Sequence, residues 1–588
     1  MTEEKSPTLP QSPHPLEERP TKASSKAAET HEENQPQEGR PLKRWVQTGY
    51  AIACFAVCLL PFAGMLWAPT EHTSTTAASA ALPGLIDEEG GPNIGYLPQL
   101  GLYFEDHFAF RNELIDLNSR IQVSLFATSP TNQVVAGSEG WLYYGGELND
   151  FLARDPLSVR AASNIAHNLS LMQGYAQAMG ARFAFAIAPN KSSLYPGHMP
   201  YYLPQGENGN IALIKAALEE QGVNYVDLFS LFEAQEEELY CLTDSHWNAE
   251  GALLVANALL KACGEDEATL LLRSEALVVG DIEKMLHPAW PVPERVPDIS
   301  VGGWSFSGGE GSVEDAAIVT HSEEFLAQGS QGSQDAQGSQ GAQGSQDATL
   351  LMFRDSFANT LIPLLAPQFA QADFSKLVPY GFTQIDALRP DCVIVERAER
   401  HVRLLIEQPP IMPAPQANLE ILGSRDSQTL LGYRIDGDFL VIEGWIDPAV
   451  ISPEDDVYVC IEAPDGHITV AVPFYLSGEA FLEGTGGAWQ AEGLLATGGE
   501  EGFVGEGQAE GATEMPANET EGATNGSAQI GGRGAENSAG STYGKSDYGF
   551  RVFVPLGYFS ENRYIISALV SAPDTGKAFT VGSVSFEG

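Results

Sequence analysis

The feature that most limits the fold of this chain is an alternation of apolar, strand-like runs with amphipathic, helix-like runs between residues 159 and 396. Parallel strands need crossovers of about a dozen residues, which helices usually supply. The alternation therefore predicts an α/β fold with a doubly wound parallel sheet. We expect strands at residues 183–188, 223–228, 349–356, 376–380 and 392–396, and helices at 159–179, 211–220, 248–262, 358–370 and 384–388.

The pattern changes after a Pro-rich hinge at residues 408–416. Short alternating strands separated by Gly, Pro and Asp turns are typical of a β-sandwich, which we expect over residues 431–588, behind a linker at 411–430. We expect its strands at residues 432–435, 439–446, 456–461, 467–472, 548–554 and 564–570. Residues 328–348 and 484–546 are low in apolar residues and rich in Gly, and both are predicted to be disordered insertions.

Residues 1–95 are predicted to form a tail, a membrane anchor and a linker. Residues 1–44 are rich in Pro, Glu, Ser and Lys, so we expect a disordered cytoplasmic tail. Residues 45–68 carry no charge and match the roughly 20 residues that span a bilayer. Seven Lys or Arg residues precede this run and none follows before Arg111, which predicts a transmembrane helix with all later residues outside the cytoplasm. A cleaved signal peptide is the alternative. Residues 69–95 are predicted to be a linker.

Composition excludes several classes of function. The formal net charge is -47, and no cluster of Lys and Arg with aromatics follows residue 45, so nucleic acid is not an expected partner. No calcium loop and no Cys/His zinc spacing is present, and we expect no metal or other cofactor. Outside the apolar run, Cys241, Cys263, Cys392 and Cys460 are expected to be buried free thiols, with a Cys241–Cys263 disulfide left open as the alternative.

Three residues form a candidate catalytic set. Asp244 stands two residues before His246, a spacing that lets a carboxylate orient an imidazole acting as a general base. Ser356 stands where a predicted strand gives way to a helix, the place where doubly wound folds expose reactive groups. Each residue taken singly is more often structural, and Ser356 also suits a helix N-cap, as does Asn248 for the helix after His246.

Five short motifs occur in order between residues 96 and 410: 103–111, the Gly-Trp-Leu-Tyr-Tyr turn at 140–144, 189–191, 243–248 and 354–357. In these motifs the chain resembles the SGNH-hydrolase-like polysaccharide O-acetyltransferases of the alginate O-acetylation type, also called DHHW proteins. The resemblance implies a permuted SGNH-like catalytic domain over residues 96–410. It also implies that Asp244 orients His246, that His246 is the base and that Ser356 is the nucleophile.

The resemblance further implies a membrane-anchored, extracytoplasmic enzyme that acetylates a cell-surface or secreted polysaccharide. Its acetyl groups would come from a partner, a polytopic membrane-bound O-acyltransferase. Relatives sometimes carry a carbohydrate-binding module where the predicted sandwich lies. Ser245 departs from the Thr or His that relatives often carry at its position.

No family residue identifies the oxyanion hole. For it we expect the Ser356 backbone N–H together with Asn190 or Lys191, because acyl transfer needs donors at the developing oxyanion. Lys191 has two alternative roles, binding an acidic sugar or pairing with a surface carboxylate. Arg354 is included among the expected oxyanion or substrate-binding residues.

Two rival functions use the same residues. An acetylesterase would have the same triad and differ in passing the acetyl group to water. A non-catalytic glycan-binding or assembly protein would use Asp244, His246 and Ser356 only for its fold.

Overall fold

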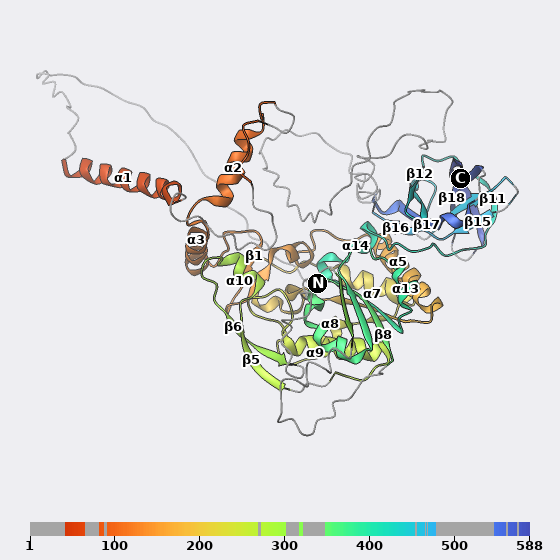
Figure 1. Cartoon of the computed structure of the whole chain (residues 1–588), viewed down its shortest axis with the longest axis horizontal. Coiled ribbons are helices and arrows are strands. Elements are labelled where there is room, and N and C mark those ends of the chain that lie inside the picture. Colours follow the sequence, from red (N-terminus) through yellow and green to blue (C-terminus); the bar gives the residue numbers. More distant parts are fainter. Residues whose placement is uncertain are drawn as a thin grey trace, which may run out of the picture. The chain divides into compact units, whose positions relative to one another are not determined.

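The computed structural model describes residues 41–64, 81–86, 91–207, 209–268, 272–300, 317–321, 347–452, 455–464, 466, 468–477, 546–559, 563–572 and 575–587 (Figure 1). The chain divides into two compact units, one up to Arg111 and one from Asn112 onward. Apart from Asp347, Ala348 and Ser546, the two predicted insertions lie outside the described residues. Ala348 is buried, so the first insertion ends before it rather than at it.

The N-terminal unit holds helices α1 (Pro41–Gly64) and α2 (Tyr96–His107). Large apolar side chains such as Trp45, Tyr50 and Phe55 are exposed along α1. Residues 41–44 are helical, which corrects the predicted end of the disordered tail, and residues 1–40 and 65–68 lie outside the described residues. Among the helices that the structure describes, none is long and apolar enough to cross a membrane, so the transmembrane helix expected at 45–68 is not confirmed.

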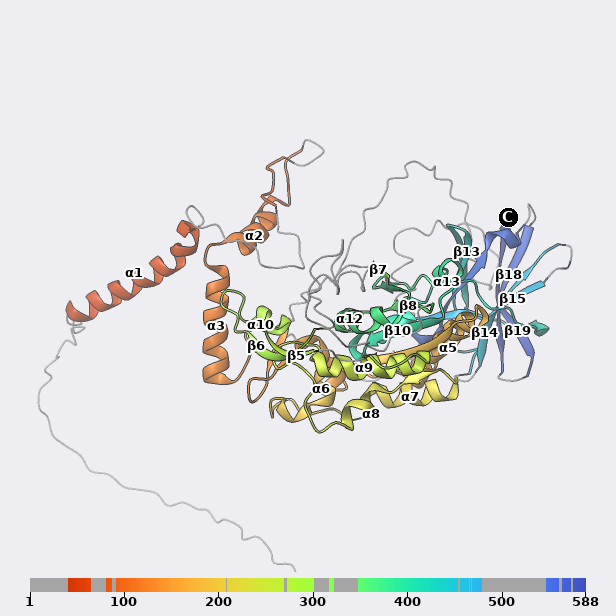
Figure 2. The same cartoon turned by 60° about the horizontal axis from the view of Figure 1, so that its bottom comes forward.

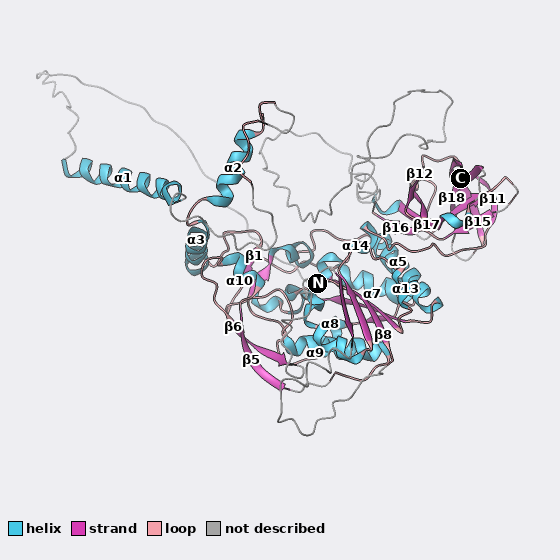
Figure 3. Ribbon diagram, in the orientation of Figure 1, coloured by secondary structure: helices cyan, strands magenta, loops and turns pink. Residues whose placement is uncertain are grey.

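The second unit contains a six-stranded sheet in the order β4-β3-β10-β8-β9-β7 (Figure 3). All neighbours are parallel except β7, which pairs antiparallel with β9 at one edge. The predicted α/β fold with a doubly wound parallel sheet is thus confirmed. The strands are β3 (Arg182–Ala188), β4 (Tyr225–Val226), β7 (Ala317–His321), β8 (Thr349–Phe353), β9 (Gln371–Ser375) and β10 (Cys392–Ala398).

Both faces of this sheet are buried, as parallel sheets require. Along β3, Phe183, Phe185 and Ile187 belong to one apolar cluster and the alanine after each of them to the other, because successive side chains point to opposite faces. Helices α5 (Val159–Ala178), α7 (Asn210–Glu220), α13 (Gln384–Leu388) and α14 (Leu404–Glu407) contribute to the first cluster. Helices α8 (Leu228–Glu233), α9 (Ala249–Cys263) and α12 (Ile362–Leu365) contribute to the second.

Four predicted elements differ from the structure. Strand β8 ends at Phe353, short of the predicted 349–356. The expected helix at 358–370 is broken into η3 (Ser356–Thr360), α12 and η4 (Ala366–Gln368), and Pro363 and Pro367 lie within it. Proline removes a helical hydrogen bond, which accounts for the breaks. The strand expected at 376–380 lies at 371–375 instead, ahead of the cis peptide bond before Pro379. Strand β4 is shorter than the predicted 223–228, because Asp227 caps α8.

A disulfide joins Cys263, the last residue of α9, to Cys392, the first residue of β10. It corrects both the expected free thiols and the alternative Cys241–Cys263 bridge. The two cysteines are 129 residues apart and both are buried. Their pairing depends on the packing of α9 against the sheet, which cysteine spacing does not reveal. Cys241 and Cys460 are free thiols.

Smaller elements lie in the segment before β3, in the turns after β3 and β10, and between α9 and β8. The hairpin formed by β1 and β2 is contacted by α10, and β5 pairs with β6. These elements are α3 (Arg111–Phe126), β1 (Val134–Ala136), β2 (Leu142–Tyr144), η1 (Gly145–Glu147), α4 (Leu148–Phe151), α6 (Lys191–Leu194), η2 (Pro196–His198), β5 (Leu272–Val278), α10 (Asp281–Leu286), β6 (Glu294–Ser300) and η5 (Glu399–His401).

The C-terminal region has two sheets, ordered β11-β19-β18-β14-β15 and β12-β13-β17-β16 (Figure 2). Buried residues of both sheets share one apolar cluster with α5. The Asn168 side chain on α5 bonds to both the backbone N–H and the carbonyl of Tyr475. The strands are β11 (Glu420–Ser424), β12 (Leu430–Asp436), β13 (Phe439–Trp445), β14 (Asp456–Glu462), β15 (Ile468–Ala471), β16 (Phe474–Leu476), β17 (Gly549–Pro555), β18 (Arg563–Ser571) and β19 (Lys577–Glu587).

All six strands predicted in this region are confirmed, as β12, β13, β14, β15, β17 and β18. Strands β11, β16 and β19 were not predicted. Strand β11 lies within the segment 411–430 that we expected to be a linker, and it pairs parallel with β19.

Candidate active site

Three neighbouring strands, β3, β10 and β8, end at the same edge of the sheet. The turns after them carry the Pro189–Lys191 motif, the Glu399–His401 turn and the Arg354–Ser356 turn. Doubly wound sheets place their sites at this carboxyl edge, since the loops that follow adjacent parallel strands converge there.

The structure brings Asp244, His246 and Ser356 together at this edge. The Ser356 Oγ lies 2.9 Å from His246 Nε2, and His246 Nδ1 lies 2.7 Å from Asp244 Oδ1. A carboxylate at Nδ1 fixes the tautomer in which Nδ1 carries the proton, leaving Nε2 to accept the serine proton. The arrangement is therefore that of a nucleophile, its base and the group that orients the base.

Aromatic packing joins the Asp244–His246 turn to the serine turn 110 residues away. Trp247 is fully buried and its ring lies 4.9 Å from that of Phe357. The Trp247 indole N–H also donates to Thr360 Oγ1 at 2.7 Å. Since Trp247 follows His246 and Phe357 follows Ser356, this contact holds His246 against Ser356.

Asp244 is held in its ionised form. Its Oδ1 also accepts the backbone N–H of His246 at 3.0 Å, and its Oδ2 accepts the backbone N–H of Asp281 at 2.9 Å. Burial raises the pKa of Asp244, but the hydrogen bonds and the charge of His246 outweigh burial and leave the pKa below its usual value. Asp281 begins α10, where the helix N-terminus also favours a negative charge.

The pKa of His246 is shifted in the opposite direction. Burial lowers its pKa, but the hydrogen bond and charge of Asp244 outweigh burial and raise the pKa above its ordinary value. The site thus stabilises the imidazolium that forms when His246 takes a proton, as a general base requires.

Asp281 is a further carboxylate at the site, and no sequence pattern predicted it. It accepts the Ser245 backbone N–H at 2.7 Å and the Ser245 hydroxyl at 2.5 Å. Its Oδ2 lies 3.8 Å from His246 Nδ1. Donor atoms of Asp244, His246 and Asp281 all lie within 4.8 Å of one another, a spacing that a cation would fit. These atoms are engaged with one another or with Ser245, so we interpret the group as a hydrogen-bond network.

The serine turn is fixed by Asp355, which caps η3 and accepts the N–H groups of Phe357 at 3.0 Å and Ala398 at 2.7 Å. The N-cap is therefore Asp355, and Ser356 is the first residue inside the short helix. Burial raises the pKa of Asp355, but His401, Arg397 and Arg400 together lower it below its usual value. Within the described part of the chain the Ser356 backbone N–H has no hydrogen-bond partner, which leaves it available to an oxyanion.

Lys191 does not have the expected role. Its ammonium donates to the carbonyls of Leu142, Leu242 and Asp244 at 2.7, 2.7 and 3.0 Å. The side chain is fully buried, and burial lowers its pKa to about 8. An ammonium has three protons, so none remains for an oxyanion, an acidic sugar or a surface carboxylate. Lys191 instead stabilises the turn that carries Asp244 through these hydrogen bonds.

Arg354 is also fully buried, and its Nη1 donates to the Asn359 side chain at 2.6 Å and to the Asp355 carbonyl at 3.3 Å. It braces the serine turn, which corrects its expected place among substrate-binding residues. Asn190 donates its backbone N–H to Glu399 at 2.8 Å and one amide hydrogen to Asp150 at 3.2 Å. Its second amide hydrogen remains available, so Asn190 stays a candidate oxyanion donor.

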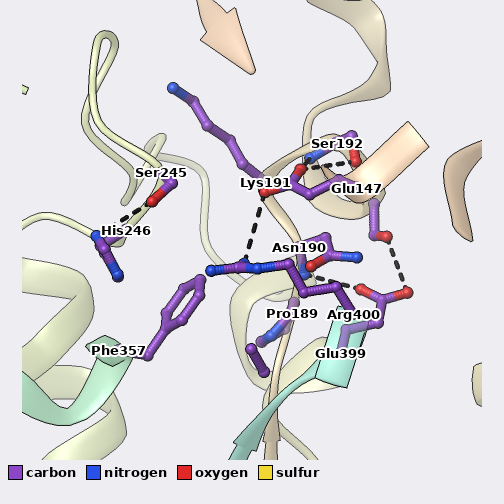
Figure 4. Close-up of polar contacts among 12 residues, drawn as sticks. Glu147, Pro189, Asn190, Lys191, Ser192, Ser245, His246, Phe357, Glu399 and Arg400 are labelled. Carbon is purple, nitrogen blue, oxygen red and sulfur yellow. Dashed lines mark hydrogen bonds and ion pairs between the residues drawn. The ribbon is translucent and has the colours of Figure 1, made fainter. Parts of the chain in front are cut away.

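Arg400 is a second residue that we did not predict. Its guanidinium lies 5.2 Å from the ring centre of Phe357 (Figure 4). It lies 5.4 Å from the ring centre of Tyr144. Its Nη1 lies 3.8 Å from Glu147, and its side chain is 9% exposed. The Nε and Nη1 atoms have no hydrogen-bond partner among the described residues. Arg400 lies a few residues after the predicted strand 392–396, and the loop that follows a parallel strand is the signal that could have found it.

Comparisons with known proteins agree with the resemblance seen in the motifs. Residues 134–287 match the family described as SGNH hydrolase-like domain, acetyltransferase AlgX. The chain is 28% identical over 187 residues to the probable alginate O-acetylase AlgJ of Pseudomonas syringae pv. tomato, which covers 31% of this chain and 46% of that protein. It is 25% identical over 170 residues to the Pseudomonas fluorescens protein of the same name, covering 28% and 41%. The match thus spans less than half the length of these relatives.

Solved structures similar to this chain include the O-acetyltransferase domain of Pseudomonas putida AlgJ, with 16% identity and a TM-score of 0.30, covering 46% of this chain and 91% of that one. Bacillus cereus PatB1 is similar at 16% identity and a TM-score of 0.34, covering 46% and 96%. A DHHW family protein from Eubacterium siraeum is similar at 15% identity and a TM-score of 0.32, covering 46% and 92%. The predicted resemblance to SGNH-hydrolase-like polysaccharide O-acetyltransferases is confirmed by the family match and the curated relatives.

Proposed function

We propose, from the premise that this chain carries an SGNH hydrolase-like domain similar to alginate O-acetylases, that it transfers acetyl groups to hydroxyls of a polysaccharide through an acetyl-serine intermediate. The observation that carries the proposal is the hydrogen-bonded series from Asp244 through His246 to Ser356. No metal or cofactor enters this chemistry.

In the first half of the reaction, Ser356 Oγ attacks the carbonyl carbon of an acetyl ester while His246 Nε2 takes the hydroxyl proton. The tetrahedral intermediate collapses, the ester bond to the donor breaks, and His246 returns the proton to the departing alcohol. Acetyl-Ser356 and the free donor alcohol are the products.

In the second half, a sugar hydroxyl gives its proton to His246 and attacks the acetyl-Ser356 carbonyl. The bond to Ser356 breaks, and Ser356 regains a proton from His246. We assign the Ser356 N–H as one oxyanion donor and keep the free amide hydrogen of Asn190 as the candidate for the second.

The cellular location is part of the same proposal. The Cys263–Cys392 disulfide suits an oxidising compartment outside the cytoplasm. The exposed apolar side chains of α1 and the basic residues before residue 45 support membrane attachment through this segment. Acetyl-coenzyme A is absent from that compartment, so a polytopic membrane-bound O-acyltransferase would supply the acetyl group. Fractionation of cells producing the full chain, with and without residues 45–68, tests the attachment.

The two C-terminal sheets would form a β-sandwich that serves as a carbohydrate-binding module. Their shared apolar core and their packing on α5 support this assignment. Removal of residues 431–588 is not a clean test, because it uncovers that core. Binding of glycan arrays by the full chain with an alanine at Ser356 measures the module without turnover.

A partition experiment tests the proposed reaction. The protein is loaded with acetyl groups from p-nitrophenyl acetate, freed of donor, and mixed with glycan oligomers or with buffer alone. Transfer of the acetyl group to sugar supports a transferase. Discharge only to water identifies an esterase, and no acetyl adduct in a folded protein points to a binding or assembly protein.

A further inference from the structure

Helix α3 buries polar residues and exposes apolar ones. Its two fully buried side chains are Asp116 and Ser119. Leucine and isoleucine side chains spaced three or four residues apart form a stripe along one side of the helix, and the exposed fractions of Leu114, Leu117, Ile121 and Leu125 are 42%, 53%, 44% and 72%. A surface helix of a water-soluble domain normally has the opposite arrangement, so the stripe calls for a partner that covers it.

Buried contacts fix this orientation of α3. The carboxylate of Asp116 lies 2.8 Å from His287 Nδ1 and accepts a hydrogen bond from Arg120 Nε at 3.1 Å. Val123 packs against the apolar cluster to which α10 contributes, and Figure 2 shows α3 beside α10. Because α10 begins with Asp281, which binds Ser245, α3 is attached to the part of the domain that carries the catalytic turn.

Exposed aromatic side chains flank α3. Trp290 is 56% exposed, and its carbonyl accepts a hydrogen bond from Arg120 Nη2 at 2.8 Å. Tyr201 and Tyr202 are also exposed, and the Tyr202 hydroxyl donates to the carbonyl of Ala127, the residue after α3, at 3.4 Å. Trp and Tyr are enriched where a bilayer meets water, because their rings are apolar and their N–H or O–H groups stay hydrated.

We call the stripe together with Trp290, Tyr201 and Tyr202 the α3 face, and its charge differs from that of the whole chain. Helix α3 contains two acidic and two basic residues, which sum to zero, and the stripe itself is uncharged. The whole chain has a formal net charge of -47. An uncharged apolar face is suited to the boundary between phospholipid headgroups and acyl chains.

A second copy of the chain is a poorer occupant of the α3 face. Helix α3 has 16 residues, so at about 1.5 Å per residue and ~10 Å in width it covers roughly 240 Å². A stable dimer buries about 800 Å² on each partner. Two chains that each carry a net charge of -47 also repel one another.

The order of the chain favours a bilayer as the occupant. Helix α1 ends at Gly64 and α3 begins at Arg111, so α3 is the first helix of the second unit after the exposed apolar side chains of α1. If residues 45–68 attach the chain to a membrane, α3 is the element of the catalytic domain that the attachment holds nearest to the lipid.

We propose that the α3 face lies in the headgroup region of a phospholipid bilayer, so that the SGNH-like domain rests on the membrane surface. The inference extends the proposed membrane attachment and adds a second contact, made by the folded domain itself. Through α10, this contact holds the turn that carries Asp244 close to the surface from which a membrane-bound donor would deliver acetyl groups.

Labelling by a photoactivatable lipid tests the inference on the full chain. The protein is reconstituted in phosphatidylcholine vesicles whose lipids carry a diazirine on the acyl chain near the headgroup, irradiated, digested and mapped by peptide mass. Label is expected on the peptides that contain α3 and Trp290. No label is expected on α7, where Leu213 is exposed but lies outside the α3 face.

The peptide 45–64 separates the two possible failures. The vesicles contain no other protein, so an unlabelled α3 peptide overturns the inference, and α3-to-α3 crosslinks would then show a second copy as the occupant. An unlabelled 45–64 peptide would instead refute the proposed attachment, and a labelled α3 peptide would still support the α3 face.

A set of variants tests the stripe. Leu117→Ser with Ile121→Ser removes two of its apolar side chains, whereas Leu213→Ser makes the same change at an exposed position of α7. The double variant is expected to lower α3 labelling about tenfold without changing its Tm, and Leu213→Ser to change neither. Equal α3 labelling of the folded double variant and the wild type overturns the assignment. A double variant with a lowered Tm is replaced by Leu117→Ser alone, judged by the same criterion.

Discussion

Replacing Asp281 with asparagine should move the acid limb of the pH–rate profile toward lower pH. Charges of Asp244, Asp281 and Arg400 act on His246, and Asp281 raises its pKa. Asp281 Oδ2 lies 3.8 Å from His246 Nδ1, and its side chain is 34% exposed. Because water screens a carboxylate that is one third exposed, the interaction is discounted to about 1 kcal/mol. Loss of this charge should therefore lower the pKa of His246.

The direction in which the acid limb moves follows from the protonation state of His246 that reacts. His246 must be neutral to accept the proton of Ser356, so a lower pKa keeps it active at lower pH. The assay is hydrolysis of p-nitrophenyl acetate, with kcat/KM measured from pH 4 to pH 9. We expect the acid limb of Asp281→Asn to lie at a lower pH than that of the wild type.

Ser245→Ala is the matched control for this prediction. It removes the hydroxyl that links Asp281 to His246 but leaves the Asp281 charge in place, so its acid limb should not move. An Asp281→Asn limb that stays fixed or moves to higher pH would refute the argument that Asp281 acts on His246 through its charge. If the plateau value of kcat/KM falls in both variants and neither acid limb moves, Asp281 only positions His246.

Two further predictions concern stability. Thiol titration of the denatured, unreduced protein should find four thiols among the six cysteines, and six free thiols would contradict the disulfide. The double variant Cys263→Ala with Cys392→Ala should have a free energy of unfolding about 4 kcal/mol lower, because the bridge spans 129 residues. Lys191→Met should cost about 3 kcal/mol in denaturant unfolding, because three carbonyls lose the ammonium donor and only that of Leu242 keeps another, the Leu142 backbone N–H. Unchanged stability with a lost kcat would restore Lys191 to the oxyanion hole.

Local patterns predicted much of the fold. Helices α5 and α13 and strand β10 lie close to their expected bounds, because apolar periodicity and flanking turn residues determine them locally. Asn248 caps α9 as expected, accepting two backbone N–H groups. Strand β9 was misplaced because its mixed sequence, Gln371–Ser375, is less apolar than the segment after it.

The site was predictable where a short spacing or the end of a strand identified it. Asp244 and His246 are two residues apart, and Ser356 follows a strand. Asp281 was missed because its contact with Ser245 depends on how a segment outside the alternating pattern folds back. Lys191 was misassigned because a sequence does not show which backbone carbonyls will surround an ammonium group.

The central claim is that Ser356 carries the acetyl group with His246 as its base. The most direct measurement is peptide mass mapping of the full chain, quenched in acid after brief exposure to p-nitrophenyl acetate, alongside Ser356→Ala and His246→Gln. The account predicts one acetyl group on Ser356 in the wild type, none in Ser356→Ala, and a much slower gain in His246→Gln. An acetyl group found elsewhere, or a wild-type protein that stays unmodified while folded, would contradict it.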